Sequence, residues 1–117
     1  GDSRFYQRCA RYVSEHLYTA LRAEEMAAAL GYTRSYLCTR FHQETGMSLK
    51  QYIQREKAME ARRLLRFTDQ ELGQIAALLD FSSQSHFQTV FKKVTGETPM
   101  AYRRRTRGAE QGMSGIF

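Results

Sequence analysis

The side chains that most often carry out covalent or metal chemistry are few and scattered in this sequence. The 117 residues include two cysteines, Cys9 and Cys38, and three histidines, His16, His42 and His86. No Cys-x-x-Cys pair or Cys/His cluster is present, which argues against a zinc site, and two lone cysteines are typical of a reducing compartment. No Ser or Cys forms a catalytic pattern with these histidines, and no glycine-rich phosphate loop is found. The sequence therefore predicts neither an enzyme nor a metal or cofactor site.

Charged side chains suggest a different kind of chemistry. Lys and Arg number 18 against 12 Asp and Glu, a formal charge of +6. Cationic residues gather at Lys92–Lys93 and in the run Arg103–Arg105. This balance favours an anionic partner such as nucleic acid, although charge alone does not identify one.

The elements that must position these residues are predicted to be helices. Apolar residues recur with helical spacing, and the only proline, Pro99, follows Thr98 at a favourable helix start. The predicted helices are 4–18, 23–30, 33–44, 48–66, 69–79, about 83–95 and 99–105. A Thr68–Glu71 capping box opens the fifth, and either Ser82 or Ser83 starts the sixth. We expect an all-α fold of about seven helices and no strand. It should form one domain, 1–107, followed by a flexible tail, 108–117.

The second half of the sequence repeats the first. Residues 26–33 (MAAALGYT) align with 75–82 (IAALLDFS), and residues 34–52 align with 84–102 after one extra residue, Ser83. The identical pairs are Ala27/Ala76, Phe41/Phe91, Thr45/Thr95, Gly46/Gly96 and Tyr52/Tyr102. A solenoid would need at least three repeats, so two copies favour the duplication of a recognition unit.

Each copy has the pattern of a helix-turn-helix motif. Ala27 and Ala76 supply small side chains where two helices approach closely, and Gly31 suits a turn with positive φ. The expected hydrophobic contacts are Met26, Leu30, Tyr32, Leu37 and Phe41 in the first copy, and Ile75, Leu79, Phe81, Phe87 and Phe91 in the second. A hairpin that serves only as core is the alternative for either copy, but two copies on a basic chain favour binding to duplex DNA.

One stretch resembles a known family. Residues 74–104, QIAALLDFSSQSHFQTVFKKVTGETPMAYRR, resemble the signature region of the AraC/XylS transcription regulators. The matching residues are Ile75-Ala76, Phe81, Ser82, Phe87, Phe91-Lys92-Lys93, Gly96, Thr98-Pro99 and Tyr102-Arg103. The likeness covers about residues 5–105. It implies two homeodomain-like subdomains, with helix-turn-helix motifs at about 22–46 and 69–96, a linker helix at about 48–66 and a closing helix at about 99–105.

The resemblance also implies a function and a setting. The chain would be the C-terminal DNA-binding domain of a bacterial regulator in the cytoplasm, bound to the nucleoid. In this family the domain follows an effector-binding or dimerisation domain, so we expect an excised fragment. Activation through contact with RNA polymerase is commoner in the family than repression.

Four residues depart from the family pattern. Asp80 replaces the usual turn glycine, and Asp tolerates the left-handed conformation better than most residues. Thr39 and Thr89 occupy positions where a base-contacting arginine is common, and Arg40 stands where a hydrophobic residue is commoner. These changes leave the fold credible and the target sequence open.

Recognition helices present their N-terminal residues to base edges in the major groove. The expected base contacts are Arg34, Ser35, Tyr36, Cys38 and Thr39 in the first motif, and Gln84, Ser85, Gln88 and Thr89 in the second. Arginine pairs bidentately with guanine and glutamine with adenine, whereas threonine discriminates less sharply. A solvated helix face is the alternative for any single residue, and Tyr36 could equally stack on the DNA backbone.

The expected phosphate contacts are Arg40, His42, Lys92, Lys93, Arg103, Arg104 and Arg105. A linker helix of about 18 residues spans roughly 27 Å, slightly less than one duplex turn of roughly 34 Å. Such a spacer would place both recognition helices in successive major grooves of an asymmetric site, given some bending of the DNA. The rival class is a basic helical adaptor that binds proteins, which would show no preference for one DNA sequence.

Overall fold

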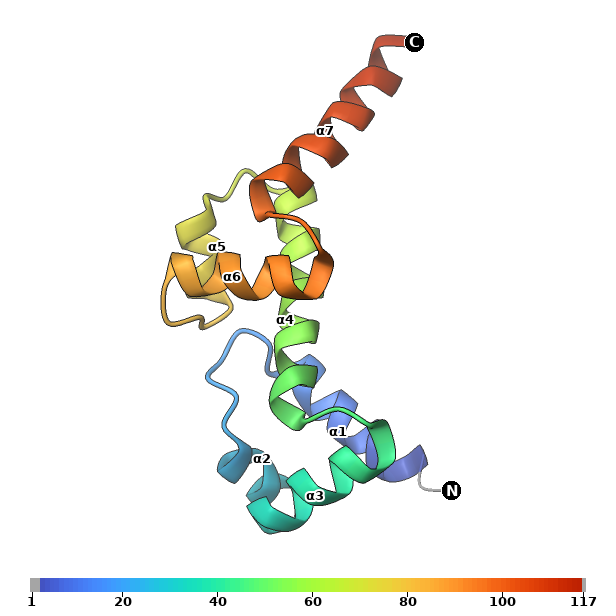
Figure 1. Cartoon of the computed structure of the whole chain (residues 1–117), viewed down its shortest axis with the longest axis vertical. Helices are drawn as coiled ribbons and strands as arrows, with labels where there is room; N and C mark the ends of the chain where they lie inside the picture. The colour runs from blue at the N-terminus through green and yellow to red at the C-terminus, as the bar shows by residue number, and fades with distance from the viewer. Residues whose placement is uncertain (1–2, 117) are drawn as a thin grey trace. The chain divides into compact units, whose positions relative to one another are not determined.

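The computed structural model describes the backbone of residues 3–116 and the side-chain environments of residues 4–108. The described backbone forms seven helices joined by turns and loops (Figure 1). They are α1 (Ser3–Glu15), α2 (Ala23–Leu30), α3 (Arg34–Thr45), α4 (Leu49–Phe67), α5 (Leu72–Leu78), α6 (Gln84–Thr95) and α7 (Pro99–Ile116). The all-α fold predicted from the sequence is confirmed.

The chain divides into two compact units between Glu56 and Lys57, inside α4. The core of the first unit lies between α1, α2, α3 and the start of α4, and consists of Phe5, Cys9, Val13, Met26, Ala27, Leu37, Phe41, Leu49 and Tyr52. Burial raises the pKa of the Cys9 thiol to about 11, which keeps it protonated at neutral pH. Cys9 is therefore a core residue, as its position in the sequence predicted.

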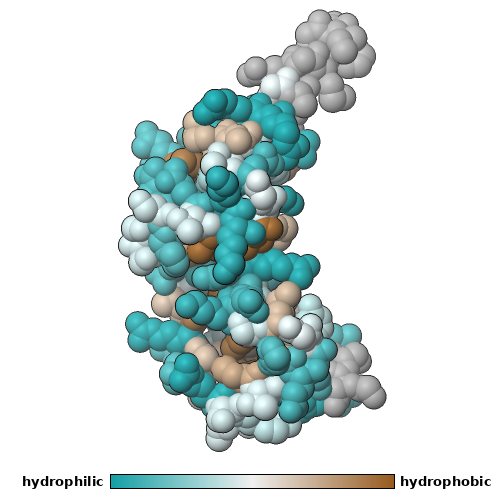
Figure 2. Space-filling view, viewed as in Figure 1, coloured by the Kyte–Doolittle hydropathy of each residue, from teal (hydrophilic) through white to brown (hydrophobic). Residues whose placement is uncertain are grey.

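The second unit repeats this plan with its own core. Its buried residues are Ala58, Ala61, Leu64, Leu65, Leu72, Ile75, Ala76, Leu79, Phe87, Phe91 and Tyr102. Within each unit, the face seen in Figure 2 is largely hydrophilic, with hydrophobic residues in small separate areas. This distribution matches the sequence, in which apolar residues recur on one face of each helix.

The two helix-turn-helix motifs have matching turns. In the first, the Tyr32 amide donates to the Ala27 carbonyl at 2.8 Å, and in the second the Phe81 amide donates to Ala76 at 2.9 Å. Gly31 occupies the left-handed region in the first turn at φ 85°, and Asp80 does so in the second at φ 57°. The second turn therefore survives without its glycine, as expected for Asp.

Three element boundaries differ from those predicted. The first helix ends at Glu15 rather than residue 18, because the His16 ring lies 2.7 Å from the Tyr12 carbonyl and takes over a bond at the helix end. Thr68 does not cap α5, because α5 begins at Leu72 and the Thr68 hydroxyl accepts from the Gln70 amide at 3.3 Å while donating to Leu64 at 2.6 Å. The capping box of α5 is formed instead by Glu71 and Gln74.

The third difference concerns the end of the chain. The closing helix, predicted to end near 105 with a flexible tail at 108–117, continues to Ile116. Arg103 and Arg107 lie one turn apart on α7. Arg103 bonds to Leu65 in the last turn of α4, and Arg107 bonds to Asp69 just after it, so this part of α7 is anchored on both sides of residue 105. The glycines at 108, 112 and 115 each disfavour a helix by about 1 kcal/mol, far less than a proline would. The last residue of the predicted tail, 117, lies outside the described residues.

Candidate nucleic-acid interface

The exposed face of α3 follows from how the helix is anchored. The Thr33 hydroxyl caps its start by accepting from the Tyr36 amide at 3.1 Å, and Leu37 and Phe41 are fully buried. With 3.6 residues per turn, the opposite face carries Ser35 and Thr39. Of the five base-contact residues predicted here, Arg34, Ser35, Tyr36 and Thr39 are exposed and Cys38 is half-buried.

Helix α6 presents an equivalent face. The Ser83 hydroxyl accepts from the His86 amide at 3.0 Å, and Phe87 and Phe91 are fully buried. The predicted base contacts Gln84, Ser85 and Thr89 are exposed, and Gln88 is half-buried. The Thr89 hydroxyl donates to the Ser85 carbonyl at 3.0 Å, which leaves its methyl group and lone pairs on the surface. The structure thus brings each predicted set together on one exposed helix.

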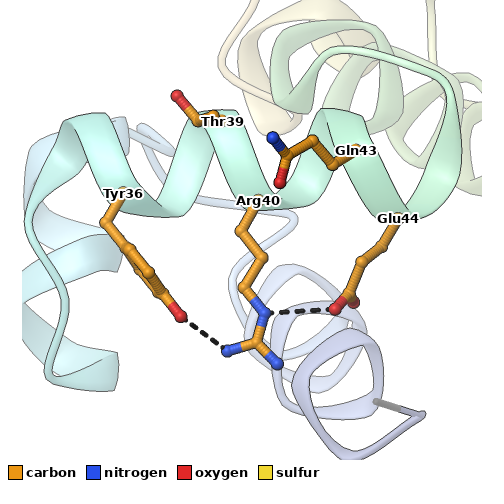
Figure 3. A pocket seen from close by; sticks show the side chains of 5 residues that line it. All are labelled: Tyr36, Thr39, Arg40, Gln43 and Glu44. Carbon is orange, nitrogen blue, oxygen red and sulfur yellow. Dashed lines mark hydrogen bonds and ion pairs between the residues drawn. The ribbon is translucent and has the colours of Figure 1, made fainter. Parts of the chain in front are cut away.

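Arg40 is half-buried, and its guanidinium is bonded within the first unit. Its Nε donates to Glu44 at 3.1 Å, and another guanidinium nitrogen donates to the Tyr36 hydroxyl at 2.9 Å (Figure 3). The guanidinium carbon lies 4.2 Å from the centre of the Phe5 ring. Arg40 follows the buried Leu37 by three residues, so its side chain lies at the edge of the core. This placement does not support the predicted phosphate contact.

The three arginines of the predicted 103–105 run have different environments. Arg103 is half-buried and donates to the carbonyls of Leu65 and Thr68 at 2.9 and 3.2 Å. It caps the end of α4, a role it shares with Arg107, which also bonds to Thr68. Arg103 is therefore committed to the fold and is not placed for a phosphate.

Arg104 and Arg105 are both exposed. Arg105 forms an ion pair with Glu97 at 2.6 Å, and this hydrogen bond lowers the pKa of the Glu97 carboxyl. Exposed ion pairs are worth little in water, so a phosphate could compete for Arg105. The remaining predicted phosphate contacts, His42, Lys92 and Lys93, are exposed.

A shallow hollow on α3 includes Gln43, which was not among the contacts predicted from the sequence. Tyr36, Thr39, Arg40, Gln43 and Glu44 line it (Figure 3). Gln43 is exposed and follows Thr39 by one helical turn, so the helical period alone could have placed it on the same face. Arg34, at the start of α3, is paired with Glu24 at 3.4 Å in an exposed and therefore weak ion pair.

The described side chains contain no group of three or more His, Cys, Asp or Glu able to hold a metal ion. Among those same residues, no helix is both long and apolar enough to cross a membrane. The described residues do contain two capped helices, α3 and α6, with polar, exposed faces. Each packs against a short helix, to which a tight turn joins it. This is the geometry of a helix-turn-helix DNA reader.

Comparison with known proteins gives the same result. The family model described as a helix-turn-helix domain matches residues 26–105, which span both motifs. The chain belongs to the AraC-type helix-turn-helix family. It is 39% identical over 74 residues to the transcriptional activator RhaR of Pectobacterium carotovorum, covering 63% of this chain and 26% of that protein. The chain spans about a third or less of the curated relatives that it matches.

Two solved structures of this type are similar along most of their length. The C-terminal domain of AraT, a response regulator from Geobacillus stearothermophilus, matches with a TM-score of 0.80 and 30% identity over 88% of this chain and 86% of that one. The DNA-binding domain of AdpA, solved with a target DNA, matches with a TM-score of 0.80 and 27% identity, covering 90% and 94% of the two chains.

Proposed function

We propose that this chain binds duplex DNA sequence-specifically, with α3 and α6 as recognition helices, as part of a bacterial transcription regulator. The observation that carries the proposal is the equivalence of the two exposed faces. Ser35 and Thr39 on α3 correspond to Ser85 and Thr89 on α6, each pair opposite two buried residues one turn apart. The AdpA domain, of similar fold, was solved with its target DNA, which supports the same use here.

The proposed base contacts are Arg34, Ser35, Tyr36, Cys38 and Thr39 on α3, and Gln84, Ser85, Gln88 and Thr89 on α6. The proposed phosphate contacts are the exposed residues among those predicted from the sequence, namely His42, Lys92, Lys93, Arg104 and Arg105. The two helices would enter successive major grooves of an asymmetric site. Because Arg40 and Arg103 bond within their own units, they are left out of the proposed contacts.

The wider role concerns a longer protein. RhaR is named as an activator, and this chain covers only 26% of its length. We therefore propose a parent regulator with an additional effector-binding or dimerisation domain, acting in the cytoplasm on nucleoid DNA. It would activate transcription through contact with RNA polymerase.

Selection of bound sites from a random duplex pool, at roughly physiological salt, tests the DNA-binding proposal. Recovery of an asymmetric site with two informative blocks about one helical turn apart supports readout by both helices. Substitution of Arg34 or Gln84 by Ala should then alter only one block each. A single block would leave only one helix as a reader. If no sequence is enriched although the chain is folded, the basic adaptor becomes the better explanation.

A further inference from the structure

The hollow on α3 contains an ion pair that neutralises its only full charges. Arg40 and Glu44 pair at 3.1 Å, and the Tyr36 hydroxyl is bonded to the same guanidinium. The charged groups of Arg40 and Glu44 and the Tyr36 hydroxyl are therefore bonded to one another. Strong, salt-dependent phosphate binding comes from unpaired Lys and Arg, and the lining of this hollow offers no excess positive charge. A neutral base edge is a better match for such a surface.

Two lining residues keep their hydrogen-bonding groups available. Among the described residues, no hydrogen bond uses the Gln43 amide or the Thr39 hydroxyl. The Gln43 side chain extends back along α3 toward Thr39 (Figure 3). An amide with one donor and one acceptor side is complementary to N6 and N7 of adenine, and a threonine methyl group packs well on the methyl group of thymine.

The same positions of α6 have a different character. Val90 and Val94 stand where α3 has Arg40 and Glu44, so the second motif has no corresponding ion pair. Lys93 stands where α3 has Gln43, next to Lys92, and both lysines are exposed. This end of α6 is therefore cationic, while the matching end of α3 is neutral at Gln43.

We infer that Gln43 is a specificity-determining residue that reads an A·T pair beside Thr39, whereas its counterpart Lys93 contacts phosphate. This inference rests on the proposed function, because it assigns roles within the same two helices. This assignment predicts that the two blocks of the DNA site differ in base preference at the positions that Gln43 and Lys93 contact. The first block gains an adenine preference there, and the second gains affinity without a base preference.

Competition between duplexes that differ at one base pair of the selected site tests the inference. Gln43→Ala should reduce the preference for the A·T pair by roughly tenfold. It should leave the slope of log K against log salt unchanged, because no charge is lost. Gln43→Lys should also lose the preference and steepen that slope by about one counterion. Gln7→Ala, an exposed glutamine on α1, is the matched control and should change neither quantity.

The reciprocal change is made at Lys93. Lys93→Gln should lower affinity for all duplexes alike and reduce the salt slope by about one. If Gln43→Ala weakens binding to every duplex equally, or changes nothing, the assignment of Gln43 is wrong while the proposed function stands. If the unaltered chain enriches no sequence at all, the proposed function fails and this inference fails with it. Thermal melting of each variant checks that its fold is intact.

Discussion

The ammonium nitrogen of Lys57 lies 2.5 Å from the carbonyl oxygen of Leu79. Lys57 is on α4 and is only 6% exposed, and Leu79 directly follows α5 at the turn of the second motif. The next residue, Asp80, is the one with positive φ. Burial lowers the pKa of Lys57 from its ordinary 10.5, and the negative charge of Asp80 partly opposes this effect. A buried cation therefore supports the turn that lacks a glycine.

This depressed pKa makes stability depend on pH. Just below pH 10.5 the unfolded chain holds the Lys57 proton more tightly than the folded chain does. The free energy of unfolding contributed by Lys57 should therefore rise as the pH increases toward 10.5. Lys57→Met removes this titration. Urea denaturation from neutral pH upward should show the stability of the original chain increasing relative to the variant.

An exposed lysine on the same helix supplies the control for this measurement. Lys50→Met should give a stability difference from the original chain that stays constant over this pH range. If the stability difference between Lys57→Met and the original chain is also constant over this pH range, Lys57 has the same pKa in the folded and unfolded chains. The proposed role of burial would then be wrong.

Most of the fold was predictable from the sequence because it is encoded locally. Helix caps such as Thr33, the left-handed turn at Gly31 and the apolar spacing of Leu37 and Phe41 each depend on residues within one or two turns. The repeat added a second, independent copy of the same pattern. These local signals were enough to place both recognition helices and their exposed faces.

Long side chains were harder to assign, since their partners lie far away in the sequence. Arg103 looked like part of a cationic run, but it bonds to Leu65, 38 residues earlier. Arg40 contacts Phe5 on α1, and Lys57 bonds to Leu79. A flexible side chain with several donors binds whichever carbonyl or ring the tertiary fold brings near. Neither periodicity nor charge counting contains that information.

The roles assigned to Arg40 and Lys92 predict opposite behaviour on substitution. Arg40→Ala should lower the free energy of unfolding by about 1 kcal/mol, because it removes the contact with Phe5 and two hydrogen bonds. It should leave the salt dependence of DNA binding unchanged. Lys92→Ala should leave stability within about 0.5 kcal/mol and reduce the salt slope by about one. Urea denaturation and binding titrations at several salt concentrations measure both effects. A reduced salt slope for Arg40→Ala would show that Arg40 contacts phosphate.

Neighbouring arginines on α7 should differ in the same way. Arg103→Ala leaves two carbonyls at the end of α4 without this donor, and should destabilise the second unit by about 1–2 kcal/mol. Arg104→Ala changes an exposed side chain and should stay within about 0.5 kcal/mol of the original. Urea denaturation compares the free energies of unfolding of the two variants, which have the same net charge. Equal stabilities would show that Arg103 does not act as a cap.

The start of α6 allows a test with adjacent serines, because the sequence left Ser82 and Ser83 as alternative caps. Only Ser83 accepts the His86 amide, at 3.0 Å, and Ser82 is exposed in the turn before it. Ser83→Ala should therefore destabilise the chain by about 1 kcal/mol, whereas Ser82→Ala should have little effect. Thermal unfolding of both variants measures the difference. Since the cap also fixes the first turn of the recognition helix, Ser83→Ala should weaken binding to the selected DNA site more than Ser82→Ala does. Equal effects on stability would mean that the hydroxyl of Ser83 does not hold the helix start.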